Sequence, residues 1–496
     1  MTARATAVLA LALCLLAASG ASADLDPLAA RVEAAIQRIA TAKAEQYECG
    51  FAIAVRAPTF HASVAAGDAD IARKLPLRAD SKFVWGSVTK LATGAGILRL
   101  ADAGVFSLDD PVAPLVDGYL RAEVQRAHAA GLGPFNFTSL RDLFGPEAAN
   151  ITVRQLATMR SGVPDYDTAK PDDTNRSLSI DPFRATCYAQ PSHDYSPLDM
   201  LAVPWVHKDP PALDWAPGTD QDYSSTNFLL LGLVLAAHAD APTWSALDQA
   251  SFRTAALRRA GFMNNTAYAA LGAPSAHTNV RGYDRTSYNG HTPDVAPGRD
   301  VGDVHGVFAG WTASDLVAPV QDVADLAHAL YQRPHSALLR DGDVEMMTNA
   351  SWGFYGFATF LLSSYSGQPT DAPAGQPDYG TLWGHLGATY GYNSMVQYNA
   401  ALNVSIAVAT NVESDYQAQP NDAFCSAYNA VRQLVLGLPE AAGNCTYLAT
   451  GYYGKCVCAT TKYTCSKREH HGQVEARCEA SYFGNESYAD CSATCQ

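Results

Sequence analysis

The pair of residues with the clearest chemical potential is Ser87 and Lys90, which lie three positions apart. In a helical segment, residues i and i+3 share a face, so the lysine amine can reach the serine hydroxyl. A serine at the start of that helix also lies in the field of its positive end, which favours a developing alkoxide. This is the arrangement that a serine nucleophile activated by lysine requires. Two fixed letters also match by chance in a long chain, so other segments must support the interpretation.

A second candidate is Tyr223, which follows a Pro-Gly turn at Pro217 and Gly218 and precedes a strongly apolar helical pattern. A phenol beside an ammonium group can have its pKa lowered and can carry protons. The alternative is a tyrosine that packs in the core and donates one buried hydrogen bond.

A third candidate is the glycine-rich segment that contains His385, Gly387 and Ala388 and precedes an apolar strand pattern. Glycines let a backbone approach a ligand closely. A backbone N–H on such an edge strand can supply half of an oxyanion hole, with the N–H of Ser87 as the other half. The alternative is a glycine-rich hairpin with a surface histidine.

The order Ser-x-x-Lys, Tyr and His-x-Gly resembles that of the serine β-lactamase-related hydrolases, which include class C β-lactamases, DD-peptidases, D-aminopeptidases and family VIII esterases. Two flanking stretches, 151–166 and 216–219, also match the habits of that family. The resemblance covers roughly residues 24–439. It implies an α/β (α+β) fold in which helices flank both faces of an antiparallel sheet and an all-α subdomain is attached.

The resemblance also implies roles for the candidate residues. Ser87 is then the acylated nucleophile, Lys90 is its base or base partner, and Tyr223 carries protons to the leaving group and from the deacylating water. Lys90 must be partly neutral to act as a base, and burial can achieve this. Acyl-enzyme chemistry of this kind requires neither a metal nor an organic cofactor.

The facing wall departs from the family pattern. Ser225 stands where the family has an asparagine, and His385-Leu386-Gly387 stands where it has Lys-Thr-Gly. We expect Ser225, His385 and Gly387 to contact the substrate and Ala388 to donate to the oxyanion. Replacing a permanent cation by a titratable one weakens the anchoring of a penicillin-like carboxylate. The expected substrate is therefore a small-molecule carboxylic ester or a D-amino-acid-type peptide or amide.

Several elements must position these residues. Helical spacing covers 25–46, buried strands are predicted at 51–55 and about 60–64, and 109–297 is mostly helix and loop. Strand patterns return late in the chain, and a helix closes this body; their ranges are 357–362, 389–398, 403–409 and 422–436. We therefore expect one hydrolase domain over residues 24–440, with a helical subdomain at about 109–297 and a sheet completed by the C-terminal part.

Composition and charge exclude several classes of protein. The chain has 496 residues, of which 48% are apolar and 17% charged, and its net charge is −15. It contains no cluster of Lys and Arg that would form a nucleic-acid-binding face. The N-terminus predicts export: Arg4 precedes the apolar run 5–18, and 21–23 has the small-x-small form of a cleavage site. We expect a signal peptide over residues 1–23, no membrane span after its cleavage, and a secreted or secretory-lumen protein. Eight Asn-x-Ser/Thr sequons agree with that route.

Cysteine use supports an oxidising compartment. Cys14 leaves with the signal peptide, and ten cysteines remain. Three of these, Cys49, Cys187 and Cys425, lie in the body, and seven crowd the predicted tail, residues 441–496. Both counts are odd, so complete pairing requires at least one disulfide between body and tail, with Cys425 as the expected body partner.

The tail is a small appendage too short to support a large core without disulfides. Two cysteines and two histidines within 456–471 also form a possible zinc set, but disulfides are favoured in an oxidising compartment. The sequence does not identify a partner for this tail.

The function that fits these patterns best is a secreted serine hydrolase that uses a Ser-Lys-Tyr acyl-enzyme mechanism. Two alternatives remain open. One is a catalytically silent binding protein that retains the scaffold. The other is an acyltransferase that uses the same site and passes the acyl group to an alcohol or an amine.

Overall fold

The computed structural model describes residues 27–167, 182–287, 297–334, 336–449, 454–470, 473–481 and 487–495. The predicted signal peptide therefore lies outside the described residues. Within the described residues, no helix combines the length and apolar character that crossing a bilayer requires.

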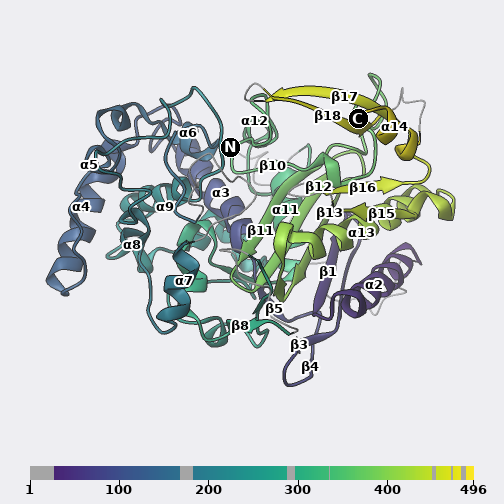
Figure 1. Cartoon of the computed structure of the whole chain (residues 1–496), viewed down its shortest axis with the longest axis horizontal. Helices are drawn as coiled ribbons and strands as arrows, with labels where there is room; N and C mark the ends of the chain where they lie inside the picture. Colours follow the sequence, from purple (N-terminus) through teal and green to yellow (C-terminus); the bar gives the residue numbers. More distant parts are fainter. Residues whose placement is uncertain are drawn as a thin grey trace.

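A six-stranded antiparallel sheet forms one half of the molecule, in the order β10-β11-β12-β13-β1-β2 (Figure 1). The strands nearest the N-terminus thus pair with those near the end of the body, because β1 pairs with β13 along its whole length. The bounds are β1 Phe51–Arg56, β2 His61–Ala66, β10 Phe360–Leu361, β11 Trp383–Thr389, β12 Tyr392–Asn399 and β13 Val404–Thr410.

Successive side chains along these strands point to opposite faces of the sheet, and each face packs into its own hydrophobic core. Phe51, Ile53 and Val55 of β1 point to a core shared with α2 (Pro27–Tyr47) and α13 (Ala418–Leu436). Ala52 and Ala54 point to the opposite core, where α11 (Val320–Tyr331) covers the sheet. Small alanines on that face let α11 pack closely against the sheet, and period-two alternation is what a sheet covered on both faces requires.

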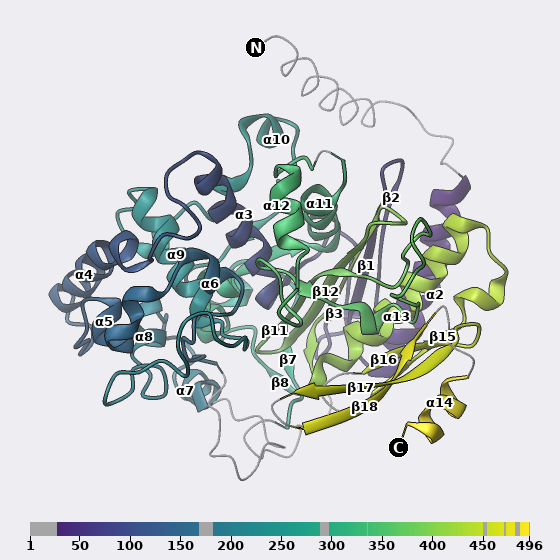
Figure 2. The same ribbon diagram turned by 90° about the horizontal axis from the view of Figure 1, so that it is seen from above.

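A mostly helical part occupies the other half of the molecule (Figures 1 and 2). Its centre is α9, whose buried residues run without a break from Thr226 to Ala236. A helix that is apolar all round must be enclosed by protein, and α3, α4 and α6 surround it. The bounds are α3 Thr89–Asp102, α4 Ala113–Ala129, α5 Leu140–Phe144, α6 Val153–Ala157, α7 Pro182–Ala189, α8 Pro197–Leu201, α9 Thr226–His238, α10 Ala255–Arg259 and α12 Asp341–Met347.

The shorter strands form smaller sheets. These are β5-β9-β6, β14-β7-β8 and the pair β3-β4. The bounds are β3 Asp68–Asp70, β4 Leu75–Pro76, β5 Lys82–Val84, β6 Ala267–Tyr268, β7 Tyr283–Asp284, β8 Arg299–Asp300, β9 Leu316–Pro319 and β14 Val412–Glu413.

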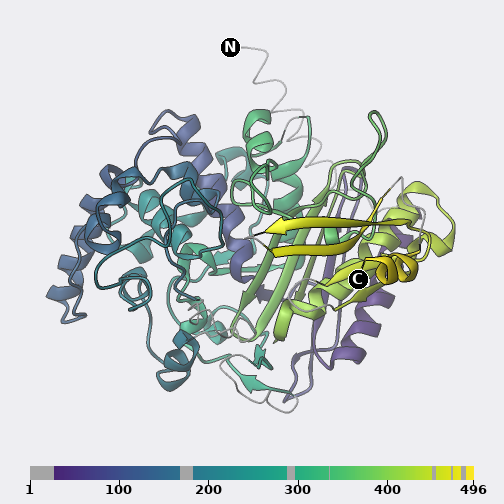
Figure 3. The same cartoon turned by 45° about the horizontal axis from the view of Figure 1, so that its top comes forward.

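The cysteine-rich tail lies on the sheet side of the molecule, away from α4 and α5 (Figure 3). It consists of two hairpins and a short helix, with bounds β15 Cys445–Leu448, β16 Lys455–Cys458, β17 Tyr463–His470, β18 Gln473–Ala480 and α14 Tyr488–Thr494. Four disulfides hold it: Cys425–Cys456, Cys445–Cys458, Cys465–Cys495 and Cys478–Cys491.

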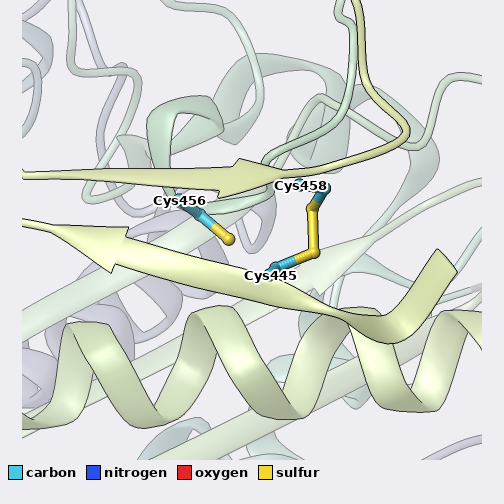
Figure 4. Close-up of side chains that lie close together, drawn as sticks. All are labelled: Cys445, Cys456 and Cys458. Atoms are coloured by element: carbon cyan, nitrogen blue, oxygen red, sulfur yellow. A yellow bond between two sulfur atoms is a disulfide. The ribbon is translucent and has the colours of Figure 1, made fainter. Parts of the chain in front are cut away.

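The predicted disulfide between body and tail is present, since Cys425 of α13 pairs with Cys456 of β16. Complete pairing is not observed, because Cys49 and Cys187 are buried and lie outside these four disulfides. The sulfurs of Cys445, Cys456 and Cys458 gather closely enough to hold a metal ion, and Figure 4 shows the disulfide between Cys445 and Cys458. Cys456 is also in a disulfide, with Cys425, so each of the three sulfurs is already bonded to another. The favoured disulfide interpretation of the tail therefore agrees with the structure.

The predicted mixed fold is confirmed, with three local differences. Ser87 lies in the short 3-10 turn η2 (Gly86–Val88), and the α-helix begins two residues later, at Thr89. The strand predicted at 357–362 is reduced to β10, and the segment around His385 is a strand, β11. The tail ends in a helix, α14, which the cysteine pattern did not indicate.

The Cys425–Cys456 disulfide closes a sequence separation of 31 residues. Replacing both cysteines by alanine is therefore expected to cost about 3.5 kcal/mol, chiefly by freeing the unfolded chain. Urea unfolding and limited proteolysis of the tail would measure the effect, with Cys49→Ala as the matched control outside the disulfides. Equal stability of the double variant and the control would contradict this prediction. If a chelator destabilised the protein and a reductant did not, the result would favour the zinc interpretation instead.

Candidate active site

The structure brings Ser87 and Lys90 together at the start of α3. Lys90 Nζ lies 2.9 Å from Ser87 Oγ, 3.2 Å from Ser225 Oγ and 3.1 Å from the carbonyl oxygen of Ala313. The lysine side chain is completely buried. An ammonium group has three N–H donors, and these three acceptors use all of them.

Burial lowers the pKa of Lys90 to about 8, while the negative charges of Asp167 and Asp165 act in the opposite direction. The amine is therefore charged below about pH 8 and increasingly neutral above it. A neutral amine that touches a serine hydroxyl can accept its proton.

The Ala313 carbonyl is held in place by side chains at the start of α3. Thr93 Oγ1 donates to the carbonyl of Thr312 at 2.7 Å, and the N–H of Leu316 donates to Thr89 Oγ1 at 2.9 Å. Both hydrogen bonds flank Ala313, so the acceptor of Lys90 is fixed from two sides.

Tyr223 lies next to this group, just before α9. The Lys90 Nζ is 5.1 Å from the centroid of its ring. Burial raises the pKa of Tyr223 well above its ordinary value, and the Ser87 hydroxyl opposes that shift only in part. The expected lowering of this pKa is therefore wrong, because desolvation of the buried phenolate outweighs the effect of the hydroxyls that lower it. Tyr223 is a neutral phenol at physiological pH.

Ser225 and Asp165 complete this side of the site. Ser225 is 1% exposed, and its backbone N–H donates to Asp165 Oδ1 at 2.8 Å. Asp165 is itself buried, and burial together with the charge of Asp167 raises its pKa well above the ordinary value. Asp165 was missed as a site residue in the sequence, although it belongs to the flanking stretch 151–166.

Strand β11 forms the facing wall and presents Ala388 to the serine turn. β10 pairs with β11 only at Trp383 and Gly384, so the far part of that edge packs against η2 instead. Gly86 has φ +52°, and a Cβ there would lie 2.6 Å from the carbonyl oxygen of Ala388. Ser394 of β12 donates to the Trp85 carbonyl at 2.9 Å and fixes the turn from behind.

Gly387 is required at the same contact, because a Cβ on it would overlap the Trp85 carbonyl. The turn that carries Ser87 and the strand that carries Ala388 therefore touch through backbone atoms. The sequence predicted that these glycines let the backbone approach a ligand; the close approach in the structure is to the serine turn itself.

His385 is completely buried, which differs from the titratable wall residue expected from the sequence. Its Nε2 lies 2.8 Å from the hydroxyl of Tyr355, and its ring packs against Phe360 with the centroids 4.7 Å apart. Burial lowers the pKa of His385 well below its ordinary value, and the charge of Lys90 adds to the effect. The histidine is therefore neutral. No pattern in the sequence indicated Tyr355 as its partner.

Replacing Gly86 by alanine tests the close approach of η2 and β11. Gly86→Ala is expected to cost about 3 kcal/mol, since it adds steric overlap with Ala388 to the strain of positive φ. Gly104→Ala is the matched control, because Gly104 also has positive φ but a Cβ there would meet nothing within 4 Å. The control should lose only about 1 kcal/mol in urea unfolding. Equal losses for the two variants would contradict the predicted contact.

Comparison with known proteins agrees with this fold. The chain is similar to a D-amino acid amidase from Ochrobactrum anthropi SV3, with 20% identity, a TM-score of 0.58, and coverage of 82% of this chain and 99% of the other. A D-stereospecific amidohydrolase from a Streptomyces species is 21% identical, with a TM-score of 0.53 over 81% of this chain and 97% of the other. A penicillin binding protein from Bacillus halodurans is 20% identical, with a TM-score of 0.53 over 79% of this chain and 99% of the other.

At these identities the three structures establish the fold. No curated protein matches the chain. The family model described as Beta-lactamase matches residues 36–424, which is most of the chain. The chain therefore belongs to the β-lactamase family, which supports a serine hydrolase of that superfamily.

Proposed function

We propose that Ser87 is the nucleophile of an acyl-enzyme mechanism and that Lys90 is its base. The observation that carries this proposal is the 2.9 Å contact between a buried amine with a pKa of about 8 and the serine hydroxyl. The neutral amine takes the hydroxyl proton while Ser87 Oγ attacks the carbonyl carbon of the substrate.

In this proposal Tyr223 protonates the leaving group. Its raised pKa keeps the phenol protonated, which suits a general acid better than a general base. After the acyl-enzyme forms, the same residues act in reverse and remove a proton from the attacking water.

The N–H groups of Ser87 and Ala388 are the proposed oxyanion donors. The support is the backbone contact between η2 and β11, which brings the two residues together on one side of the site. Because backbone donors are fixed before the reaction begins, they stabilise the developing negative charge without reorganisation.

The proposed substrate is an ester or a D-amino-acid-type amide that lacks a carboxylate beside the scissile bond. His385 is neutral, and its Nε2 is engaged by Tyr355, so the wall does not present the cation that anchors a β-lactam carboxylate. The opposite wall adds the carboxyl groups of Asp165 and Asp167, which offer no cationic anchor either. The names of two structural neighbours, a D-amino acid amidase and a D-stereospecific amidohydrolase, favour the amide class.

We further propose that the protein works in the secretory route or outside the cell. Four disulfides are stable in an oxidising compartment and rare in a reducing one. The apolar segment before residue 24 supports the same proposal from the sequence.

Covalent labelling of the mature protein with a fluorophosphonate tests the nucleophile. Intact-mass analysis is expected to show one adduct, and peptide mapping to place it on Ser87. Ser87→Ala should abolish the adduct. Lys90→Ala and Tyr223→Phe should slow turnover of an activated ester by about 10²–10⁴-fold, since each removes a proton carrier.

The matched control is Ser224→Ala, which removes a buried hydroxyl one residue from Tyr223. An adduct that persists in Ser87→Ala would move the nucleophile elsewhere. A wild-type protein that forms no adduct and hydrolyses neither esters nor D-amino acid amides would favour a silent binding protein.

A further inference from the structure

Tyr223 and Lys90 lie side by side, yet the proton path between them is not direct. The three N–H donors of Lys90 point to Ser87, Ser225 and Ala313. The amine also lies toward the face of the tyrosine ring, 5.1 Å from its centroid. A proton on Lys90 therefore has no free donor position aimed at the phenol oxygen.

The hydroxyl of Tyr223 is buried and makes no hydrogen bond of ordinary length to any residue that the structure describes. The Lys90 amine, which lies 5.1 Å from the centroid of the Tyr223 ring, hydrogen-bonds both Ser87 Oγ and Ser225 Oγ. These two hydroxyls therefore flank the amine that faces the phenol, and both act to lower the pKa of Tyr223. During acylation Ser87 is bonded to the substrate and has lost its proton. Ser225 is then the hydroxyl that remains next to both Tyr223 and Lys90.

Ser225 is held rigidly enough for such a role. Its N–H is bound by Asp165, and the residue lies at the N-terminal end of α9. The neighbouring Tyr166 N–H donates to Thr226 Oγ1 at 3.0 Å, which ties the same loop to the helix a second time. The backbone on both sides of the Ser225 hydroxyl is thus fixed.

We propose that the Ser225 hydroxyl is a proton relay between Lys90 and Tyr223, an inference that rests on the proposed acyl-enzyme function. Ser87 Oγ bonds to the substrate carbonyl carbon, and its proton passes to Lys90. As the bond to the leaving group breaks, the phenol of Tyr223 gives its proton to that group. Tyr223 then takes the proton of Ser225, and Ser225 takes one from the Lys90 ammonium. The proton of Ser87 has in effect reached the leaving group, and all three carriers are restored.

The residue type supports this assignment. A hydroxyl donates and accepts at the same atom, so it can pass a proton on. The carboxamide of an asparagine, the residue that the resembling family has here, donates from nitrogen and accepts at oxygen. The serine at position 225 therefore replaces a group that cannot pass on a proton by one that can, in addition to removing a substrate contact.

The test compares leaving groups that differ in their need for a proton. Acylation rates are measured with 4-nitrophenyl, phenyl and ethyl acetate, for wild type, Ser225→Ala, Ser225→Asn and Ser225→Thr. 4-Nitrophenolate leaves as an anion, whereas ethoxide requires protonation. Ser225→Ala and Ser225→Asn are expected to lose at least about 100-fold more rate on the ethyl ester than on the 4-nitrophenyl ester. Ser225→Thr, which keeps the hydroxyl, should restore the wild-type ratio.

Controls separate the relay from other roles. Ser224→Ala should match wild type on all three esters. The double variant Ser225→Ala/Tyr223→Phe should be no slower on the ethyl ester than the slower single variant, because both act on one proton path. Thermal unfolding checks that each variant is folded. If Ser225→Thr does not fold, the test rests on the loss of rate in Ser225→Ala and Ser225→Asn.

The possible outcomes are distinct. Equal losses on all three esters, or a rise in KM alone, would overturn the relay and make Ser225 a substrate contact. An unchanged profile in Ser225→Ala would mean that Lys90 and Tyr223 exchange protons without it. If wild type forms no acetyl adduct on Ser87 from 4-nitrophenyl acetate, the proposed function fails and the relay fails with it.

Discussion

The structure depends on one buried amine. Burying the charged amine of Lys90 costs free energy unless its N–H groups have hydrogen-bond acceptors or the amine loses its charge. Here the buried amine has acceptors, and its pKa is lowered. Three acceptors surround the amine, and burial brings its pKa close to physiological pH. Each acceptor comes from a different part of the chain: the serine turn, the start of α9, and the end of η9 (Trp311–Ala313). The serine turn, the start of α9 and η9 must therefore come together around Lys90 before the site exists.

The opposite wall follows a different physical principle. It relies on backbone contact, because Gly86 and Gly387 allow η2 and β11 to approach more closely than side chains would permit. The ring of His385 fills the space behind this wall as a neutral partner of Tyr355. One wall of the site is thus built from fixed backbone dipoles and aromatic rings, and the other from proton carriers beside two carboxyl groups. This division underlies the proposal that the substrate carries no anionic anchor.

Much of this was predictable from the sequence, and the reasons for the exceptions are physical. The spacing of Ser87 and Lys90 predicted their contact, and the apolar pattern after Tyr223 predicted α9. The pairing of early strands with late ones followed from strand patterns at both ends of the body. The partner of His385 could not be predicted, because Tyr355 lies 30 positions away in a segment with no helical or strand period. The direction of the Tyr223 shift depends on burial, which a sequence does not report.

The most direct test of this account is the titration of Lys90 itself. In protein labelled with ¹³C-lysine, the ε-carbon signal of Lys90, assigned by its loss in Lys90→Arg, should titrate with a midpoint of about 8. Asp167→Asn should move that midpoint to lower pH, because the Asp167 charge favours the ammonium form. The rate of Ser87 acylation should rise with pH through the same midpoint, as the amine becomes neutral. A midpoint near the ordinary lysine value of 10.5 would leave Lys90 charged at physiological pH and contradict its role as the base.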